Sequence, residues 1–229
     1  MRTATEPGRL QGTAERLERG ASFPTWLRVG FWACIVIAVA AVVRRAVVLA
    51  SPAGNSGPPQ MTALDAWFRM HAALTWAHIL CALALVALLP FVMRSGRGVS
   101  PGLERAFFLL GVTTGVTAYA MSANAVGGWV ERSAVLFFDT LFLVSLARAY
   151  AMGRRGDRMQ KRRWMVRAVA ILLGIATTRP VMGVFFATSP MTHWTTRQFF
   201  GVAFWIGFSI NTLAIEFWLR STAAGRRLA

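Results

Sequence analysis

Three ionisable residues of this 229-residue chain, His78, Asp139 and Arg179, lie inside long apolar stretches. An ionisable side chain inside a membrane is costly, so it usually faces a partner or a water-filled cavity. Counted at 1.5 Å per helical residue, all three lie ~12–14 Å from the same membrane face, and Thr117 of a fourth stretch reaches that level. In such a layer Arg179 would bind an anionic or carbonyl group, Asp139 would balance its charge, and His78 would carry a proton near neutral pH.

Two interpretations of this polar layer are open. In the first, Asp139 and Arg179 form a buried ion pair that fixes helix packing, with His78 hydrogen-bonded nearby. In the second, the layer is the floor of a pocket that opens to the outer side of the membrane. His71 lies on nearly the same helix face as His78 and ~10 Å nearer that surface, which favours a pocket. Its mouth would be lined by residues of the last outer loop: His193, Trp194 and Arg197.

Six apolar stretches must position these residues, and each is long enough to cross a hydrocarbon core of ~30 Å as a helix. Only a helix satisfies its own backbone hydrogen bonds at that depth. The composition agrees, because only 15% of the residues are charged and 55% are hydrophobic. The stretches are 27–49, 69–93, 105–126, 130–152, 164–187 and 198–219, with the longest connection at 50–68.

The sequence therefore predicts an all-α integral membrane protein, a bundle of six transmembrane helices within residues 25–220. Residues 1–24 are expected to form a disordered cytoplasmic tail, and residues 221–229 a short cytoplasmic tail. A secreted, fibrous or disordered chain is excluded by the apolar stretches, and a soluble enzyme nearly so.

The net charge of +16 predicts the orientation of the helices. If the N-terminus is cytoplasmic, the arginines on the cytoplasmic side far outnumber those outside, so both termini are predicted to be cytoplasmic. We interpret the charge as this orientation signal and as a surface for anionic lipid head groups, and not as a nucleic-acid site. The basic cytoplasmic face consists of Arg154, Arg155, Arg158, Lys161, Arg162, Arg163 and Arg167.

The first stretch has two interpretations, because Arg44 and Arg45 interrupt it. As a membrane helix, it would extend this arginine pair to the outer interface. As a signal peptide, it would be cleaved near Ala50.

Gly111 and Gly115 form a GxxxG motif, which predicts close packing against another helix of this chain or of a second subunit. In the last stretch, Asn211 is expected to make an interhelical hydrogen bond, and Glu216 to lie near Arg220 at the cytoplasmic interface. Cys34 and Cys81 are expected to be small buried apolar side chains.

No nucleotide-binding, metalloprotease or serine-hydrolase motif is present, so enzymatic activity is uncertain and less expected than its absence. No metal site and no cofactor are predicted. Haem b is the alternative, but His71 and His78 share one helix and lie ~10 Å apart, so they cannot both ligate one iron.

The pattern from residue 69 to residue 220 resembles a known family. Its most specific part is the run Arg154-Arg155-Gly156-Asp157 followed by Arg162-Arg163-Trp164-Met165-Val166-Arg167, with His78, Arg105, Thr178-Arg179 and Glu216–Arg220 around it. This resembles a bacterial family of multi-pass membrane proteins named only as a domain of unknown function (number twenty-three-zero-six). Glu104 and Lys161 stand where family members typically have histidine. The resemblance implies the helix count and the bacterial inner (cytoplasmic) membrane, and it implies no reaction.

The function expected from these observations is non-enzymatic binding or transport of a small molecule or lipid through the His78/Asp139/Arg179 layer, or an accessory role in a membrane complex. The alternatives are a membrane oxidoreductase that holds haem or quinone, and a structural partner that assembles with another membrane protein or with itself through Gly111 and Gly115.

Overall fold

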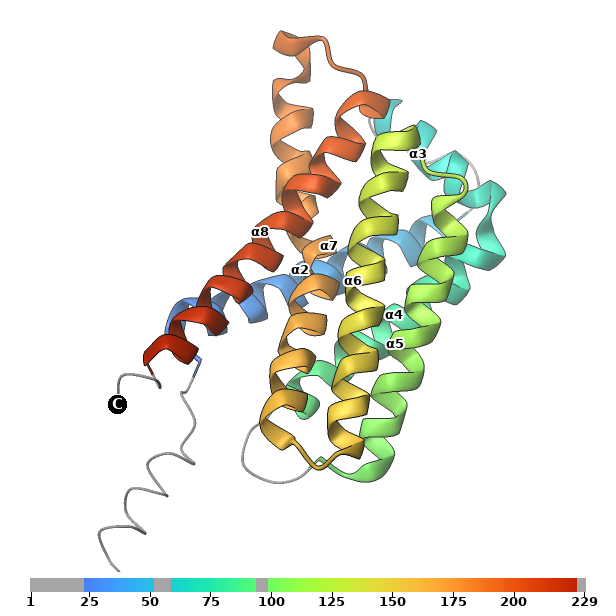
Figure 1. Ribbon diagram of the computed structural model, residues 1–229. Helices are drawn as coiled ribbons and strands as arrows, with labels where there is room; N and C mark the ends of the chain where they lie inside the picture. The colour runs from blue at the N-terminus through green and yellow to red at the C-terminus, as the bar shows by residue number, and fades with distance from the viewer. Residues whose placement is uncertain (1–22, 52–58, 94–98, 226–229) are drawn as a thin grey trace, which may run out of the picture.

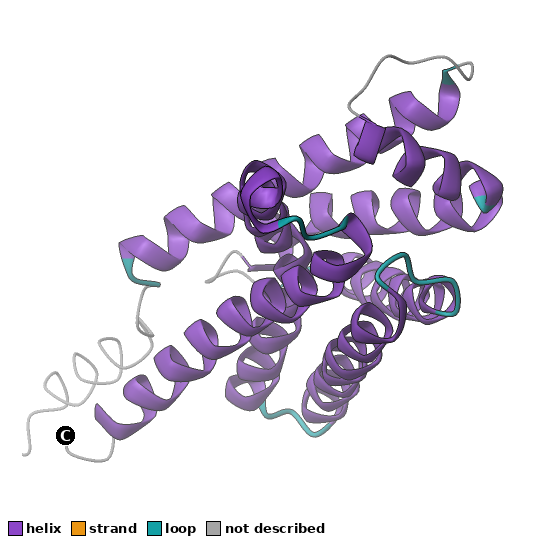
Figure 2. Ribbon diagram, turned by 90° about the horizontal axis from the view of Figure 1, so that it is seen from above, coloured by secondary structure: helices purple, strands orange, loops and turns teal. Residues whose placement is uncertain are grey.

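The computed structural model describes residues 23–51, 59–93 and 99–225, and nearly all of them are helical (Figures 1 and 2). Within these ranges the seven helices are α2 (Thr25–Ala50), α3 (Pro59–Met70), α4 (Ala72–Met93), α5 (Pro101–Ser122), α6 (Gly128–Arg154), α7 (Arg158–Thr192) and α8 (Thr196–Gly225). This confirms the all-α fold. Of the predicted N-terminal tail, residues 1–22 lie outside the described residues. At the other end, α8 continues to Gly225, into the segment that was predicted to be a C-terminal tail.

Five of these helices are long and apolar enough to cross a membrane: α2, α4, α6, α7 and α8. The sixth predicted stretch is α5, which has 22 residues, as many as α4. It is less apolar because two glycines and Thr113, Thr114 and Thr117 occupy its middle. A membrane-spanning character is thus supported directly for five of the six predicted stretches.

The two ends of the bundle differ, and they lie at the bottom and at the top of Figure 1. We call the lower end, with the α6–α7 turn and the start of α5, the basic end. The upper end, with α3, the α5–α6 turn and the α7–α8 turn, is the α3 end. Helices α5 and α6 run side by side between the two ends, whereas α2 crosses behind them at a steep angle (Figure 1).

Local signals explain where several helices begin and end. Ser100 caps α5 by accepting a hydrogen bond from the backbone N–H of Leu103, with Pro101 in the first turn, where its missing N–H costs nothing. Asp157 caps α7 in the same way through the N–H of Gln160 at 2.9 Å. Helix α7 stops at His193, which has a left-handed backbone with φ of 56°.

Helix α3 was not predicted, because residues 50–68 were expected to form a connection. It begins with Pro59, and its residues Leu64 and Phe68 are four positions apart, so both point to the bundle interior. The helical structure is interrupted at His71, and α4 begins at Ala72. Arg44 and Arg45 were expected to extend to the outer interface, but both bind Asp65 of α3, at 2.9 and 2.6 Å.

Close helix packing depends on glycine at several contacts. A Cβ atom on Gly207 of α8 would lie 2.6 Å from the backbone nitrogen of Thr178 on α7. Cβ atoms on Gly111 and Gly115 would each lie 2.7 Å from a leucine of α6, Leu146 and Leu143 respectively. The GxxxG motif therefore packs against a helix of the same chain.

A small polar cluster joins α2 to α7 and α8. Asn211 of α8 accepts a hydrogen bond from the Thr177 hydroxyl at 2.8 Å and donates one to the carbonyl of Ala170 at 3.3 Å. Cys34 of α2 lies 3.7 Å from the same hydroxyl. Asn211 thus makes the interhelical hydrogen bond that was predicted for it.

Candidate functional site

A cavity of about 650 Å³ lies inside the bundle. All seven described helices contribute to its wall, which is mostly apolar. On α5 the lining starts at Thr114, on α7 it starts at Ile171, and on α8 it ends at Phe208. The cavity therefore occupies the half of the bundle toward the α3 end, and its volume falls in the range of pockets that take a small organic molecule.

The structure places His78, Asp139 and Arg179 in the wall of this one cavity. They come from three different helices, α4, α6 and α7. Counting from the ends of the stretches predicted one level for them, because each helical residue rises by the same amount. What the structure adds is that all three also face inward.

Arg179 makes no hydrogen bond and no ion pair with any residue that the structure describes, and its Nε atom is fully buried. The charges that act on it are, in order of decreasing effect, those of Arg45, Arg44 and Glu131. No contact within 4.0 Å joins its guanidinium to Asp139. The interpretation of these two residues as a buried ion pair is therefore wrong.

Asp139 lies where α6 packs against α5. Its Oδ1 atom would be 3.2 Å from a Cβ atom on Gly115, so a larger residue there would press on the carboxylate. Its Oδ2 atom is buried and has no hydrogen-bond partner in the described part of the chain. The hydroxyl oxygen of Thr114, the residue before Gly115, also lines the cavity and is likewise buried without a hydrogen-bond partner in the described part of the chain.

His78 is oriented by Thr117, although Thr117 does not line the cavity. The Nδ1 atom of His78 lies 2.9 Å from the Thr117 hydroxyl oxygen. That hydroxyl has one proton, and it donates to the backbone carbonyls of Thr113 and Thr114 at 2.8 and 2.9 Å. The contact with Thr117 fixes the orientation of the His78 ring, and the tautomer of the ring decides which of the two atoms donates.

Three charged residues of the wall were not predicted to line it: Glu131, Arg44 and Arg45. Glu131 is only 9% exposed, lies in the first turn of α6, and accepts a hydrogen bond from the backbone N–H of Gly127 at 2.6 Å. The signal was available, since an acidic residue just after Gly127-Gly128 favours a helix N-terminus. Arg45 also reaches the wall, where its guanidinium lies 3.9 Å from the centre of the Phe68 ring.

The residues expected at the mouth do not line the cavity. His71 packs on Trp67, with ring centres 4.9 Å apart, and the exposed Trp194 stacks on Phe185 at 5.9 Å. His193 and Arg197 are exposed. The cause is the length of α7, whose 35 residues span ~50 Å and carry the last turn beyond the cavity. The wall at the α3 end comes from α3 itself.

Since His78 is the one histidine in the wall, two histidine ligands for a haem are not brought together here.

The predicted basic face divides into two groups. Arg154, Arg155 and Arg158 are exposed around the α6–α7 turn. The remaining members turn toward other helices. Lys161 binds Glu104 of α5 at 2.5 Å, so the two positions that depart from the resembled family contact each other. Arg162 lies over the Phe23 ring at 5.5 Å.

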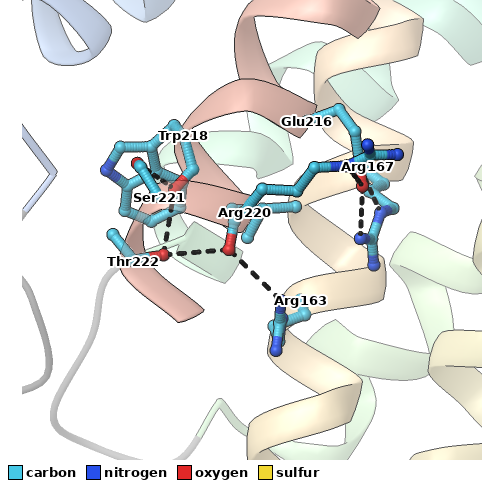
Figure 3. Close-up of polar contacts among 8 residues, drawn as sticks. Arg163, Arg167, Glu216, Trp218, Arg220, Ser221 and Thr222 are labelled. Carbon is cyan, nitrogen blue, oxygen red and sulfur yellow. Dashed lines mark hydrogen bonds and ion pairs between the residues drawn. The ribbon is translucent and has the colours of Figure 1, made fainter. Parts of the chain in front are cut away.

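Figure 3 shows how the other two members of the face hold α8 to α7. Glu216 binds Arg167 at 2.9 Å and Arg220 at 3.1 Å, while Arg163 donates to the carbonyl of Leu219 at 3.2 Å. These contacts engage basic side chains in helix packing. The surface that is open to anionic lipid is therefore smaller than the sequence predicted.

The chain was compared with family models, curated proteins and solved structures, and it matches none of them.

Proposed function

We propose that the chain is an integral membrane protein that crosses the bacterial inner membrane six times, through α2 and α4–α8, with both termini in the cytoplasm. Five of these helices are apolar enough to span, and α5 runs antiparallel to α6 over a comparable length. The exposed arginines of the α6–α7 turn gather at one end, which favours that end as cytoplasmic. Helix α2 supplies part of the cavity wall, which supports its retention in the mature protein.

Cysteine labelling tests this topology. In a background with Cys34→Ala and Cys81→Ala, Asp157→Cys should resist an impermeant maleimide in intact cells, whereas Thr195→Cys should react. The two sites lie in the turns at opposite ends of α7. Rapid labelling at position 157 with protection at position 195 would show that the orientation is the opposite of the proposed one.

We further propose that the protein binds a small apolar molecule or lipid that carries an anionic group, as a transporter or as an accessory subunit and not as an enzyme. One observation carries this proposal: a guanidinium without a hydrogen-bonding partner among the described residues faces a cavity of about 650 Å³ with mostly apolar walls. A buried unpaired cation is costly, and an anionic ligand would compensate it.

The test uses decanoate and the uncharged 1-decanol with the protein in lipid nanodiscs. Decanoate should raise the thermal unfolding temperature of the wild type, and Arg179→Leu should abolish this rise, since a hydrogen-bonded charge is worth roughly tenfold or more in affinity. Arg148→Leu is the control, because Arg148 is exposed and distant from the cavity lining. An equal rise in wild type and Arg179→Leu would exclude the proposed role of Arg179.

A further inference from the structure

Three buried polar atoms in the cavity wall have no hydrogen-bond partner within the described ranges. They are Nε of Arg179, Oδ2 of Asp139 and Oγ1 of Thr114. A buried polar group without a partner costs free energy, so three in one wall mark a place where a ligand supplies the missing partners. Two of the three belong to side chains of opposite charge.

These two charges do not neutralise each other, because no ion pair within 4.0 Å joins Asp139 to Arg179. Glu131 makes no ion pair with Arg179 either, and its Oε2 atom already accepts a hydrogen bond from the backbone N–H of Gly127 near the helix end. Asp65 is occupied as well, by Arg44 and Arg45. The cavity therefore presents one cationic position and one separate anionic position, each open to a partner.

Asp139 of α6 and Thr114 of α5 both line the cavity, and each has a buried oxygen without a partner among the described residues. The Asp139 carboxylate lies against Gly115, the residue that follows Thr114 on α5. A carboxylate beside a hydroxyl recognises a group that donates several hydrogen bonds, and an ammonium group has three donors. Arg179 provides the complementary fork of donors for a carboxylate.

Part of the wall, where α6 faces α8, carries a row of phenylalanines. Phe208 lies between two other rings of the lining, with centres 5.2 Å from Phe138 and 6.0 Å from Phe204, and Phe200 follows at 5.3 Å from Phe204. Such a row of rings offers an apolar surface for a hydrocarbon chain or an aromatic group.

We propose that the ligand is a zwitterionic amphiphile: its anionic group binds Arg179, its ammonium group binds Asp139 and Thr114, and its apolar part packs on the phenylalanine row. This inference rests on the proposed function and narrows it from any anionic molecule to one that also carries an amine.

The experiment compares three compounds of equal chain length: 2-aminodecanoic acid as the zwitterion, decanoate as the anion and decylamine as the cation. Thermal unfolding of the nanodisc-embedded protein is measured against the concentration of each compound. The wild type should respond to the zwitterion at about tenfold lower concentration than to decanoate, since a charge-assisted hydrogen bond is added. Decylamine can use only the Asp139 position, so it should also need a higher concentration than the zwitterion.

Variants then assign the preference to residues. Asp139→Asn should remove the advantage of the zwitterion over decanoate while the response to decanoate stays. Glu216→Gln is the matched control, a carboxylate changed to an amide outside the cavity. If Asp139→Asn does not yield folded protein, Thr114→Val should reduce the same advantage, with the exposed Thr113→Val as its control.

The outcomes separate the two proposals. Equal responses to 2-aminodecanoic acid and decanoate in the wild type would overturn the zwitterion and leave the anion site intact. A zwitterion advantage that persists in Asp139→Asn and Thr114→Val would also overturn it. No response to either carboxylate would overturn the proposed function itself.

Discussion

Glu216 at the basic end and Asp139 in the cavity wall are both acidic residues on long apolar helices, yet their surroundings differ. Glu216 binds two arginines, and Glu104 nearby binds Lys161. Asp139 faces the same cavity as Arg179, and neither has a partner among the residues that the structure describes. At the basic end, charge contributes to helix packing. In the cavity, charge is left available, which packing alone does not explain.

The largest predicted effect comes from the space available at two glycines, Gly207 in a tight helix contact and Gly183 at the cavity. Gly207→Ala should destabilise the protein by about 3 kcal/mol, because its Cβ atom would collide with the backbone of Thr178. Gly183→Ala should be nearly neutral, because Gly183 borders the cavity and no atom lies within 4 Å of the added Cβ. Thermal unfolding of both variants in one detergent checks this. Similar losses in the two variants would contradict a cavity at Gly183.

Replacing the carboxylate by an amide should change the free energy of unfolding in opposite directions at Glu216 and at Asp139. Glu216→Gln should lower the free energy of unfolding by about 1–2 kcal/mol, because it leaves Arg167 and Arg220 with weaker partners. Asp139→Asn should raise it by about 1 kcal/mol in the absence of ligand, because it removes a buried charge that has no partner. Both can be measured by unfolding under identical conditions. Destabilisation by Asp139→Asn would show that its carboxylate supports the fold.

The smallest predicted effect concerns the pair between α5 and α7. A double-mutant cycle with Glu104→Gln and Lys161→Met should give a coupling energy of about 0.5–1 kcal/mol, as expected for a partly exposed ion pair. Raising the salt concentration should weaken the coupling. A coupling of zero would mean that the contact does not stabilise the packing of these helices.

The fold was largely predictable because each membrane helix must bury an apolar run of a fixed minimum length. The exception was α3, which is too short for that argument. Its helical face becomes visible only when Leu64 and Phe68 are known to face a cavity. The ends of α7 were also misjudged, because capping by Asp157 and the left-handed His193 lie outside the apolar stretch.

That His78, Asp139 and Arg179 belong to one site was predictable from the sequence, but the rotation of their helices was not. Counting residues predicted one level for all three. Whether two of them touch depends on how the helices are turned about their axes, and glycine contacts such as Gly115 against Asp139 set that rotation. Glu131 and Arg45 escaped notice because residues at the ends of apolar stretches usually meet water.

The contact of Arg44 and Arg45 with Asp65 bears on how the protein assembles during synthesis. Helix α2 otherwise packs on α7 and α4, and α7 emerges from the ribosome long after α2 has entered the bilayer. Asp65 follows α2 closely along the chain, so its ion pairs can form while most of the protein is still being translated. The single carboxylate of Asp65 offsets one of the two arginine charges and ties α2 to α3, the helix that follows it in the chain.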